Sequence, residues 1–500
     1  MFTRRRFLQT LGALTVSTRL HAQSFPFALG VASGYPTPDG VVLWTRLTGL
    51  SDPLAVPVRW AIAADEAMKT IVMSGTAHAE PAWAHSVHVQ VRGLVPERWY
   101  WYRFTAAGAE SAIGRTRTAP LASAPNPRLR LAFASCQQYE QGYFNAYRHI
   151  AADAPDLVAF LGDYIYESTW GKEHVRSHGS GEPYTLEDYR ARYALYRSDP
   201  DLQAAHAACP WIVTWDDHEV DNDYADDRPE DGMERAPFLE RRAAAYRAYY
   251  EHMPLPPGMQ PKGPDMRIHT HLDWGQLARF HILDTRQYRS WQACPRKGRR
   301  GGSNTIDIEH CERLPRPGRS MLGRAQERWL EQSLGESRAA WNLVTRTTPM
   351  AQFDTKPGPG RRAWTDGWDG YPAARQRLLE QLKHSSNPVV LGGDVHSFNV
   401  NQLRIDFDDP GSPVIASEFV ATSITSQSWS QERLDRYLPD NPHMLLADSR
   451  FRGYGRVELT PRRFQTDLRA MESVQRRDAA CGTLATFVVE DGRPGPVRAA

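Results

Sequence analysis

The sequence lacks an apolar segment long enough to span a membrane, and it has no internal repeat and no low-complexity tract. An excess of charge of one sign is also missing, because 60 basic residues stand against 58 acidic ones. Four basic residues lie within positions 1–22, and the remaining 56 leave the rest of the chain at −2. The sequence therefore predicts neither a transmembrane segment in the mature protein nor the basic footprint of a nucleic-acid-binding protein.

Cysteine is scarce, with five residues in the chain: Cys136, Cys209, Cys294, Cys311 and Cys481. An odd number leaves at least one thiol unpaired, and Cys136 is our candidate because it follows a predicted strand. Cys294 and Cys311 flank an Arg- and Gly-rich loop at 293–319 and could form a bridge across it. The positive charge of this loop indicates that it is exposed and solvated. The alternative is that the charge attracts a phosphate group.

The composition, 41% hydrophobic and 24% charged, is ordinary for a globular protein, and 500 residues predict two or three domains. The N-terminus reads Arg4-Arg5-Arg6 followed by a short, weakly apolar run to Ala22. This pattern predicts a twin-arginine signal peptide at residues 1–22, too short and polar to span a bilayer. We therefore expect export by the twin-arginine machinery to the periplasm or beyond.

Residues 25–120 alternate between apolar and polar positions in short runs separated by turns, which is typical of a β-sandwich. The stretch from Gly93 to Phe104 resembles the late strands of fibronectin type III modules. Its Tyr100 and Tyr102 are expected to pack in the core and across strands rather than to bind a ligand. This N-terminal β-domain is predicted to take no part in catalysis.

A linker at 121–127 separates this part from a second predicted domain at 128–490. Here strands alternate with helices, which predicts an α/β fold with helices on both faces of a sheet. Helices are expected at 142–152, 241–252, 324–334 and 371–383, with another that begins with a capping box at Thr185. Segments 170–183, 254–265 and 293–319 look like insertions.

The central feature of the second domain is the apolar run from Leu157 to Leu161, which is stopped by Gly162. A run this short, bounded by turn residues, predicts a strand buried on both faces. Asp163 and Tyr166 follow at its carboxyl end, where open α/β sheets bind their ligands.

Three further predicted strands also lead to side chains that bind metals: 129–133 to Cys136, 211–215 to the acidic segment 216–222, and 389–391 to Asp394 and His396. Turn chemistry explains each acidic residue separately, but it does not explain why ligand types follow all four strands. The pattern predicts a hydrolytic metal centre where the four strand ends meet at one edge.

Hydrolysis of a phosphoester needs charge neutralisation on the phosphoryl oxygens, an activated water and help for the leaving oxygen, which two adjacent metal ions can supply. Asp163 is the candidate for a bridging carboxylate, because it follows the middle strand and has ligands on either side in the sequence. Asp217, Asn222 and Asp394 are hard oxygen donors suited to Ca²⁺, Mg²⁺ or Mn²⁺.

Cys136 and Tyr166 indicate a second kind of ion. A thiolate and a phenolate favour a trivalent or transition ion over calcium, which suggests iron beside the harder ion. His396 is a natural ligand, and His218 could ligate a metal or protonate the leaving group. The simpler alternatives are packing roles for Cys136 and Tyr166 and a structural role for His396.

Three other acidic residues near these positions allow two interpretations. Glu219 and Asp221 fit the surroundings of the metal centre or the start of a helix as well as they fit ligands. Asp284 also ends a predicted strand, where an ion pair with Arg286 is an equally good explanation.

Several motifs now occur in a recognisable order: FASC (133–136), GDYIYE (162–167), WDDHEVDN (215–222), LDTRQYR (283–289), DGWDGY (366–371) and GGDVHS (392–397). With the N-terminal segments, they make the chain resemble the PhoD-like alkaline phosphatase/phosphodiesterases of the calcineurin-like metallophosphoesterase superfamily. The resemblance covers nearly the whole chain. It implies a four-layer αββα sandwich and a phosphomonoesterase or phosphodiesterase that uses Fe³⁺ with Ca²⁺, while Mn, Mg and Zn stay open alternatives.

The resemblance also implies roles for individual residues. Iron would be held by Cys136, Asp163, Tyr166 and His396, with Asp163 shared, and the calcium side would comprise Asp217, Asn222 and Asp394. His218 occupies the position of a histidine that assists catalysis in the wider superfamily, although Asp217 replaces the usual preceding asparagine. Trp368, Asp369 and Tyr371 belong to a family motif that is expected to shape the entrance.

Two other functions compete with a metal-activated phosphatase. The same metal centre could serve a phospholipase D-like diesterase, or an enzyme acting on teichoic acid or nucleotides. A different class is an exported protein that only binds cell wall or sugar, but the intact set of Cys136, Asp163, Asp394 and His396 argues against it.

Overall fold

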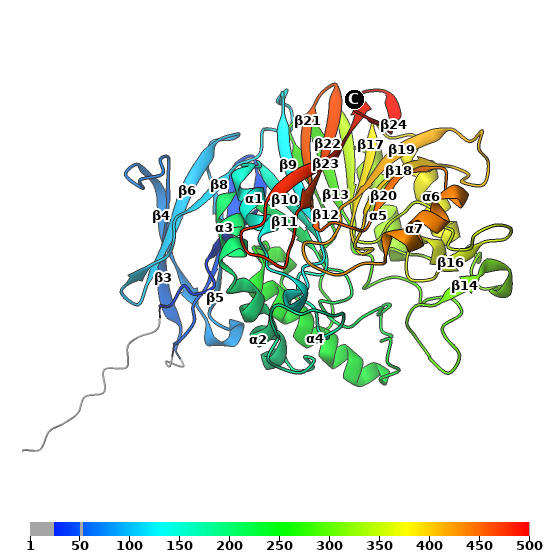
Figure 1. Ribbon diagram of the computed structural model, residues 1–500. Helices are drawn as coiled ribbons and strands as arrows, with labels where there is room; N and C mark the ends of the chain where they lie inside the picture. Colours follow the sequence, from blue (N-terminus) through cyan, green and yellow to red (C-terminus); the bar gives the residue numbers. More distant parts are fainter. Residues whose placement is uncertain (1–24, 51–53, 500) are drawn as a thin grey trace, which may run out of the picture.

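The computed structural model describes residues 25–50 and 54–499, so the predicted signal peptide at 1–22 lies outside the described residues. Two mixed β-sheets form the body of the molecule (Figure 1). The larger has ten strands in the order β24 (Arg493–Arg498), β23 (Cys481–Glu490), β22 (Arg463–Met471), β21 (Gly453–Thr460), β9 (Leu129–Ala134), β10 (Leu157–Leu161), β11 (Trp211–Thr214), β1 (Val31–Thr37), β2 (Gly40–Arg46) and β5 (Ser86–Arg92).

The second sheet has seven strands. Their order is β12 (Thr270–Trp274), β13 (Ala278–Ile282), β15 (Trp341–Thr345), β17 (Pro388–Gly392), β19 (Val414–Val420), β18 (Phe398–Arg404) and β20 (Met444–Asp448). In each sheet a parallel centre, β9-β10-β11-β1 or β13-β15-β17-β19, is flanked by antiparallel strands. The parallel strands are almost wholly buried apolar runs, as expected for sheets covered on both faces.

The two sheets contact each other through aromatic side chains. The ring of Phe464 in β22 lies 5.9 Å from that of Trp341 in β15 and 5.6 Å from that of Phe419 in β19. On the ten-stranded sheet, α1 (Ala146–Ala152) and α3 (Pro200–Ala208) pack against Trp211, whose ring lies 3.7 Å from that of His206. The predicted α/β class is therefore confirmed.

The seven-stranded sheet packs against α5 (Gly323–Gly335) and α6 (Pro372–Leu382), which share a hydrophobic cluster with Val344 and Val390. The remaining helices are α2 (Leu186–Arg197), α4 (Arg235–His252) and α7 (Gln431–Tyr437). Helix α2 begins with the predicted capping box at Thr185. Two predicted helix starts were wrong. Helix α1 begins at Ala146 rather than at residue 142, because the chain first forms a 3₁₀ turn at 139–141. Helix α4 begins at Arg235 rather than at residue 241, because Pro237 is tolerated in the first turn of a helix.

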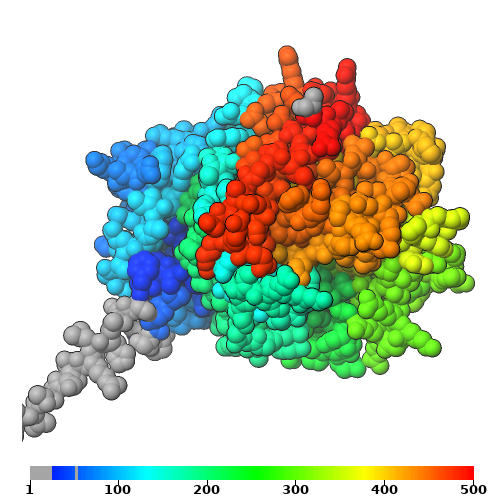
Figure 2. Space-filling model, viewed as in Figure 1, coloured from blue at the N-terminus to red at the C-terminus, as the bar shows by residue number. Residues whose placement is uncertain are grey.

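The N-terminal part forms a separate, five-stranded sheet of β4 (Ile71–Ala79), β3 (Val56–Ala63), β6 (Trp99–Ala106), β7 (Ala109–Glu110) and β8 (Gly114–Arg117). Its hydrophobic cluster is separate from the main core and contains Tyr100, Tyr102 and Phe104, which confirms their packing role. Figure 2 shows this part in blue on one side of the molecule.

Sheet pairing nevertheless continues across the two parts. Strands β1, β2 and β5 join the ten-stranded sheet through a single parallel pairing of Gly34 with Trp211. A Cβ at Gly34 would lie 2.8 Å from the Trp211 carbonyl oxygen, so this contact requires glycine. The proposed limits of two domains at 25–120 and 128–490 stay a prediction.

The Arg- and Gly-rich loop carries the disulfide that the sequence allowed, between Cys294 and Cys311. Within and beside it, β14 (Thr305–Asp307) pairs with β16 (Arg362–Trp364) at one end of the molecule (Figure 1). Cys136, Cys209 and Cys481 are free. Within residues 25–50 and 54–499, no helix is long and apolar enough to cross a membrane.

Candidate metal centre

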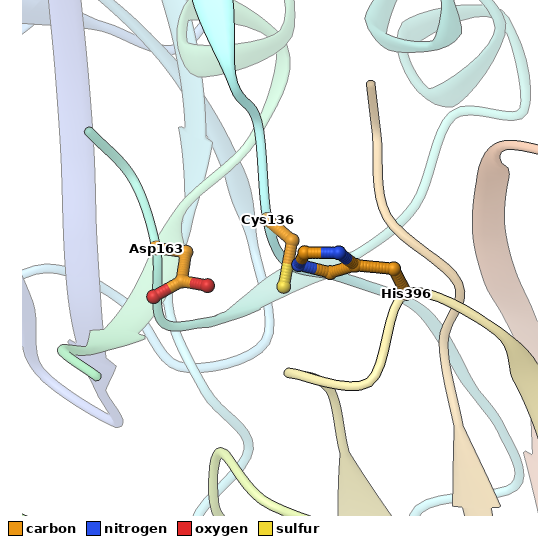
Figure 3. Close-up of side chains that lie close together, drawn as sticks. All are labelled: Cys136, Asp163 and His396. Carbon is orange, nitrogen blue, oxygen red and sulfur yellow. The ribbon is translucent and has the colours of Figure 1, made fainter. Parts of the chain in front are cut away.

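The predicted strand ends meet, but they come from two sheets rather than one. Cys136 and Asp163 follow β9 and β10 of the ten-stranded sheet, whereas His396 follows β17 of the seven-stranded sheet. The Cys136 thiol, an Asp163 carboxylate oxygen and a His396 ring nitrogen all lie within 4.8 Å of one another (Figure 3). The prediction of a single sheet edge was wrong because β17 pairs with β15 and β19 instead.

The backbone at the strand ends adopts an unusual conformation. Cys136, Asp163, Asp394 and His396 have φ values of 59°, 58°, 70° and 54°, in the left-handed region. Such residues each cost on the order of 1–3 kcal/mol and occur mainly where function requires a particular side-chain direction. Gly393 allows the sheets to approach, since a Cβ there would lie 2.3 Å from the Ser135 hydroxyl oxygen.

Tyr166 lies at the centre of this group. Its hydroxyl donates to Asp163 Oδ2 at 3.0 Å, accepts from Ser426 at 2.8 Å, and lies 3.1 Å from His396 Nε2. Its ring also packs on that of His218 at 4.1 Å. A tyrosine that only packed in the core would not contact three polar side chains through its hydroxyl, so these contacts favour a ligand role for Tyr166.

The buried acceptors of this group lack partners of their own. Asp163 Oδ1 and Asp394 Oδ2 are buried, and within the described part of the chain neither has a hydrogen-bond partner. Burial and neighbouring carboxylates raise the pKa of both groups well above the usual range, and burial together with Asp163 raises the pKa of Cys136 and Tyr166. A cation would satisfy the oxygens and favour the ionised ligands, so the donor set fits a metal centre.

Asp217 and His218 form a second group with Asp163, in which the ligand atoms again lie within 4.8 Å of one another. The His218 Nδ1 lies 2.7 Å from Glu167 Oε2. Burial opposes the charged imidazole, but Glu167, Asp217 and Asp163 together raise the pKa of His218 well above its usual value. Glu167 was missed in the sequence because a glutamate after a strand gives no sign of a histidine partner 51 residues away.

Arg286 links the acidic residues behind the strand ends. It pairs with Asp216 and lies 3.5 Å from Asp217 and 2.8 Å from Asp366, while Asp366 also pairs with Arg289. Burial raises the pKa of Asp217, but Arg286 and His218 lower it below its usual range. The side-chain ion pair of Asp284 with Arg286 that the sequence suggested is not formed, because Asp284 accepts the Arg286 backbone N–H instead.

Three further residues of the acidic segment 216–222 have different contacts. Glu219 accepts backbone N–H groups of Asp163, Tyr164 and Asp216 at 2.6–3.1 Å and so holds two strand ends together. Asp221 pairs with Arg241 at 3.0 Å. The Asn222 amide donates to Glu230 at 2.6 Å, next to the cavity described below.

A third group was not anticipated. Carboxylate oxygens of Asp217, Asp223 and Asp366 lie within 4.8 Å of one another, and all three residues are buried. Asp223 directly follows the WDDHEVDN motif, and Asp366 is the first residue of the DGWDGY motif. Their position at these motifs was the sequence signal that could have identified this third group.

Some of the metal-ligand candidates line a cavity of about 750 Å³, whereas Cys136, Asp163 and Tyr166 are not part of its lining. Asp217, His218, Asp394 and His396 line it together with two contrasting sets of side chains. One set is acidic and the other is apolar: Glu182, Asp221, Glu230 and Asp231 against Phe353, Trp364, Trp368, Trp429, Leu434 and Met444. Asp369 also lines the cavity, whereas Tyr371 is buried and donates to the Ser290 carbonyl at 2.6 Å.

Comparison with known proteins supports these observations. Residues 131–468 match the PhoD-like phosphatase family, and residues 13–120 match the N-terminal domain of PhoD-like phosphatases. The chain is 45% identical to alkaline phosphatase D of Bacillus subtilis (strain 168), over 97% of this chain and 85% of that protein. It is also similar to the solved structure of PhoD, with a TM-score of 0.90, 44% identity, and coverage of 95% and 92% of the two chains.

Proposed function

The chain belongs to the PhoD-like phosphatase family and is a phosphoesterase, and from that premise we propose how its residues carry out the hydrolysis. The single observation that carries the proposal is the cluster of Cys136, Asp163 and His396, with buried carboxylate oxygens of Asp163 and Asp394 that have no hydrogen-bond partner among the described residues. These donors fit iron together with a harder ion such as calcium.

We propose the following ligand assignment. Iron is held by Cys136, Asp163, Tyr166 and His396, calcium is held by Asp217, Asn222 and Asp394, and Asp163 is shared. The bound ions would neutralise phosphoryl charge and supply an activated hydroxide. The thiolate and phenolate of the iron group distinguish it from a site made of oxygen donors alone.

His218 is placed to act on the leaving group. Its Nδ1 is held by Glu167, which orients the ring and supports its charge, and its side chain lines the cavity. A charged imidazole held in this way can give a proton from Nε2 to the leaving oxygen. Asp163 contributes as a shared ligand rather than as a proton donor.

The decisive experiment combines metal analysis with assays on a generic aryl phosphate monoester and diester. Asp163→Ala is expected to abolish hydrolysis of both and to lower the content of both metals, because a shared carboxylate serves two ions. Cys136→Ser should lower iron preferentially, since a neutral hydroxyl is a poorer ligand than a thiolate. Full turnover with normal metal content in Asp163→Ala would overturn the shared-ligand assignment.

The cavity favours diesters as a second class of substrate. Its volume of about 750 Å³ and its apolar wall leave room for an organic group on either side of a phosphate. A phospholipase D-like diesterase activity on the same centre therefore stays an alternative. Faster hydrolysis of the diester than of the monoester would support it.

We also propose that the protein is exported by the twin-arginine machinery to the periplasm or outside the cell, and that the fold is a four-layer αββα sandwich preceded by a fibronectin III-like β-domain. The contacts of α1 and α3 with one sheet and of α5 and α6 with the other support this layering. Replacing Arg4 and Arg5 by Lys should leave active enzyme in the cytoplasm. Normal periplasmic activity of that variant would contradict the export proposal.

A further inference from the structure

A second cavity of about 380 Å³ lies beside the disulfide-closed loop and shares no lining residue with the first. Arginine dominates its lining, with Arg228, Arg289, Arg313, Arg316 and Arg319. Asp226 is its one acidic lining residue within the described part of the chain, and it lies 3.8 Å from Arg242. The cavity is therefore strongly positive.

Four of these arginines lack an acidic partner. In residues 25–50 and 54–499, no carboxylate lies within 4.0 Å of a side-chain nitrogen of Arg228, Arg313, Arg316 or Arg319. Arg228 donates to the Arg300 carbonyl, and Arg319 donates to the carbonyls of Trp291 and Gly370. These acceptors are neutral carbonyls, so within the described part of the chain none of the four guanidinium groups is held in a close ion pair.

Two buried donors in the cavity wall also lack acceptors. The Nε atoms of Arg289 and Arg319 are buried and have no hydrogen-bond partner in the described part of the chain. The Arg289 side chain is fully buried, and only its outer nitrogens are satisfied, by Asp366 and by the Tyr224 carbonyl. A buried N–H without an acceptor is destabilising, and an anion in the cavity would supply the missing acceptor.

Part of the cavity wall, around Arg228 and Arg319, is held in place before any ligand arrives. The Cys294–Cys311 disulfide closes the loop immediately before Arg313. The Arg228 guanidinium lies 3.4 Å from the centre of the Trp291 ring, and that of Arg319 lies 4.8 Å from the centre of the Tyr371 ring. Arginines fixed in this way lose less conformational entropy on binding than free surface side chains.

We propose that this arginine cavity is a binding site for the phosphate groups of a phosphodiester chain, separate from the metal centre. The planar guanidinium group binds phosphate through two parallel hydrogen bonds, and several arginines suit more than one phosphate. The volume agrees, because about 380 Å³ corresponds to roughly a dozen waters at ~30 Å³ each and so exceeds the space of one phosphate. The chain could be a separate anionic polymer or the distal part of a polymeric substrate.

Binding is tested with a fluorescein-labelled hexamer of C3-spacer units joined by phosphorothioate diesters, which resist hydrolysis and carry no base. Fluorescence polarisation of the full, metal-loaded enzyme should show saturable binding that weakens as salt rises. Arg313→Ser/Arg316→Ser should weaken it about tenfold or more, since the variant loses charged hydrogen bonds to the phosphates. Arg300→Ser is the matched control: Arg300 belongs to the same loop but does not line the cavity.

The outcomes separate the site from its alternatives. Loss of hexamer binding in the double variant, with binding retained in Arg300→Ser, supports the proposal. Equal loss in both variants would reveal unspecific attraction to the loop, and undiminished binding in the double variant would place the hexamer elsewhere, including the metal centre; either result overturns it. Thermal denaturation at equal midpoints shows that the variants are folded.

A kinetic arm distinguishes the two sources of the chain. The hydrolysable phosphodiester form of the hexamer and a small aryl phosphodiester are compared as substrates of the double variant. A higher KM for the hexamer alone identifies the cavity as a contact for the distal part of a substrate. Unchanged KM values for both, with the loss of hexamer binding, identify a separate anionic polymer.

Discussion

The Glu167 carboxylate lies 2.7 Å from Nδ1 of His218, so that one ring nitrogen is held while the other is available to the cavity. We expect Glu167→Gln to lower kcat by about 10–100-fold, because a neutral amide orients and charges the imidazole less well. The loss should grow as the leaving alcohol becomes more basic, since such alcohols depend most on protonation. Steady-state kinetics with a series of aryl and alkyl esters measures this dependence.

Glu182→Gln is a suitable control for this prediction, because Glu182 lines the same cavity but pairs with Arg241 rather than with His218. Its effect should not depend on the leaving alcohol. A uniform loss across the ester series in Glu167→Gln would contradict a role through His218 and would indicate a general disturbance of the site.

The proposed iron ligands predict colour and a difference in metal release. A tyrosinate on Fe³⁺ absorbs visible light, so concentrated active enzyme should be coloured, and Tyr166→Phe should bleach or blue-shift the band. A calcium chelator should inactivate the enzyme quickly and reversibly while the colour persists, because oxygen-bound Ca²⁺ exchanges more readily than iron held by thiolate and phenolate. Absorption spectra and metal analysis before and after EGTA measure both effects.

Tyr164→Phe provides the comparison, since the Tyr164 hydroxyl contacts His206 rather than the candidate ligands. Its colour should equal that of the wild type. Colourless, fully active protein that contains only Zn²⁺ or Mg²⁺ would reject the iron–tyrosinate centre, although the phosphoesterase function would stand.

The apolar wall of the metal-centre cavity predicts a preference among esters. The Trp429 side chain lines the cavity, is 39% exposed and stacks on Phe353 with ring centres 6.2 Å apart. Trp429→Ala should lower kcat/KM for aryl phosphodiesters about tenfold, because less apolar surface is buried on binding. Dimethyl phosphate, which cannot reach this wall, should be affected little.

Leu121→Ala serves as the control, because Leu121 is an exposed apolar side chain that lines neither this cavity nor the arginine cavity. It should leave the hydrolysis of both esters unchanged. An equal drop for the aryl and methyl esters in Trp429→Ala would show that the tryptophan supports the site rather than contacts the ester group.

His88 predicts a loss of stability in acid. It joins β5 to α4, where its Nε2 lies 3.0 Å from the carbonyls of Tyr250 and Met253, and burial lowers its pKa from 6.5 to about 4. The unfolded chain therefore binds more protons between pH 6.5 and 4, so the stabilising effect is complete above this window and declines as the pH falls. At pH 5.5 this histidine alone should lower the free energy of unfolding by about 1.4 kcal/mol relative to pH 8.

Urea denaturation at pH 8 and 5.5 gives the loss of unfolding free energy on acidification, and the difference in this loss between wild type and His88→Gln is the contribution of His88. The variant should lose less stability on acidification, because glutamine does not titrate. His78→Gln, on the exposed strand β4, should keep the wild-type dependence. The same pH dependence in all three proteins would show that His88 does not contribute.

The sequence by itself determined which side chains follow the strands. Short apolar runs bounded by glycine are local patterns, and they correctly located β10 and the residues Asp163 and Tyr166 after it. The capping box at Thr185 and the bridge across the Arg-rich loop are also local, because each depends on neighbouring or nearby positions. These features were therefore predictable without knowledge of the fold.

Only the tertiary structure decided how these side chains meet. Tyr166 contacts His396 across 230 residues, because β17 joins the second sheet and the two sheets face each other. The contacts of Glu167 with His218 and of Arg286 with Asp366, and the arginine cavity, likewise join distant segments. A local pattern specifies where a strand ends and which face it buries, whereas strand order and sheet packing depend on long-range burial of apolar surface, and that burial brings the ligands together.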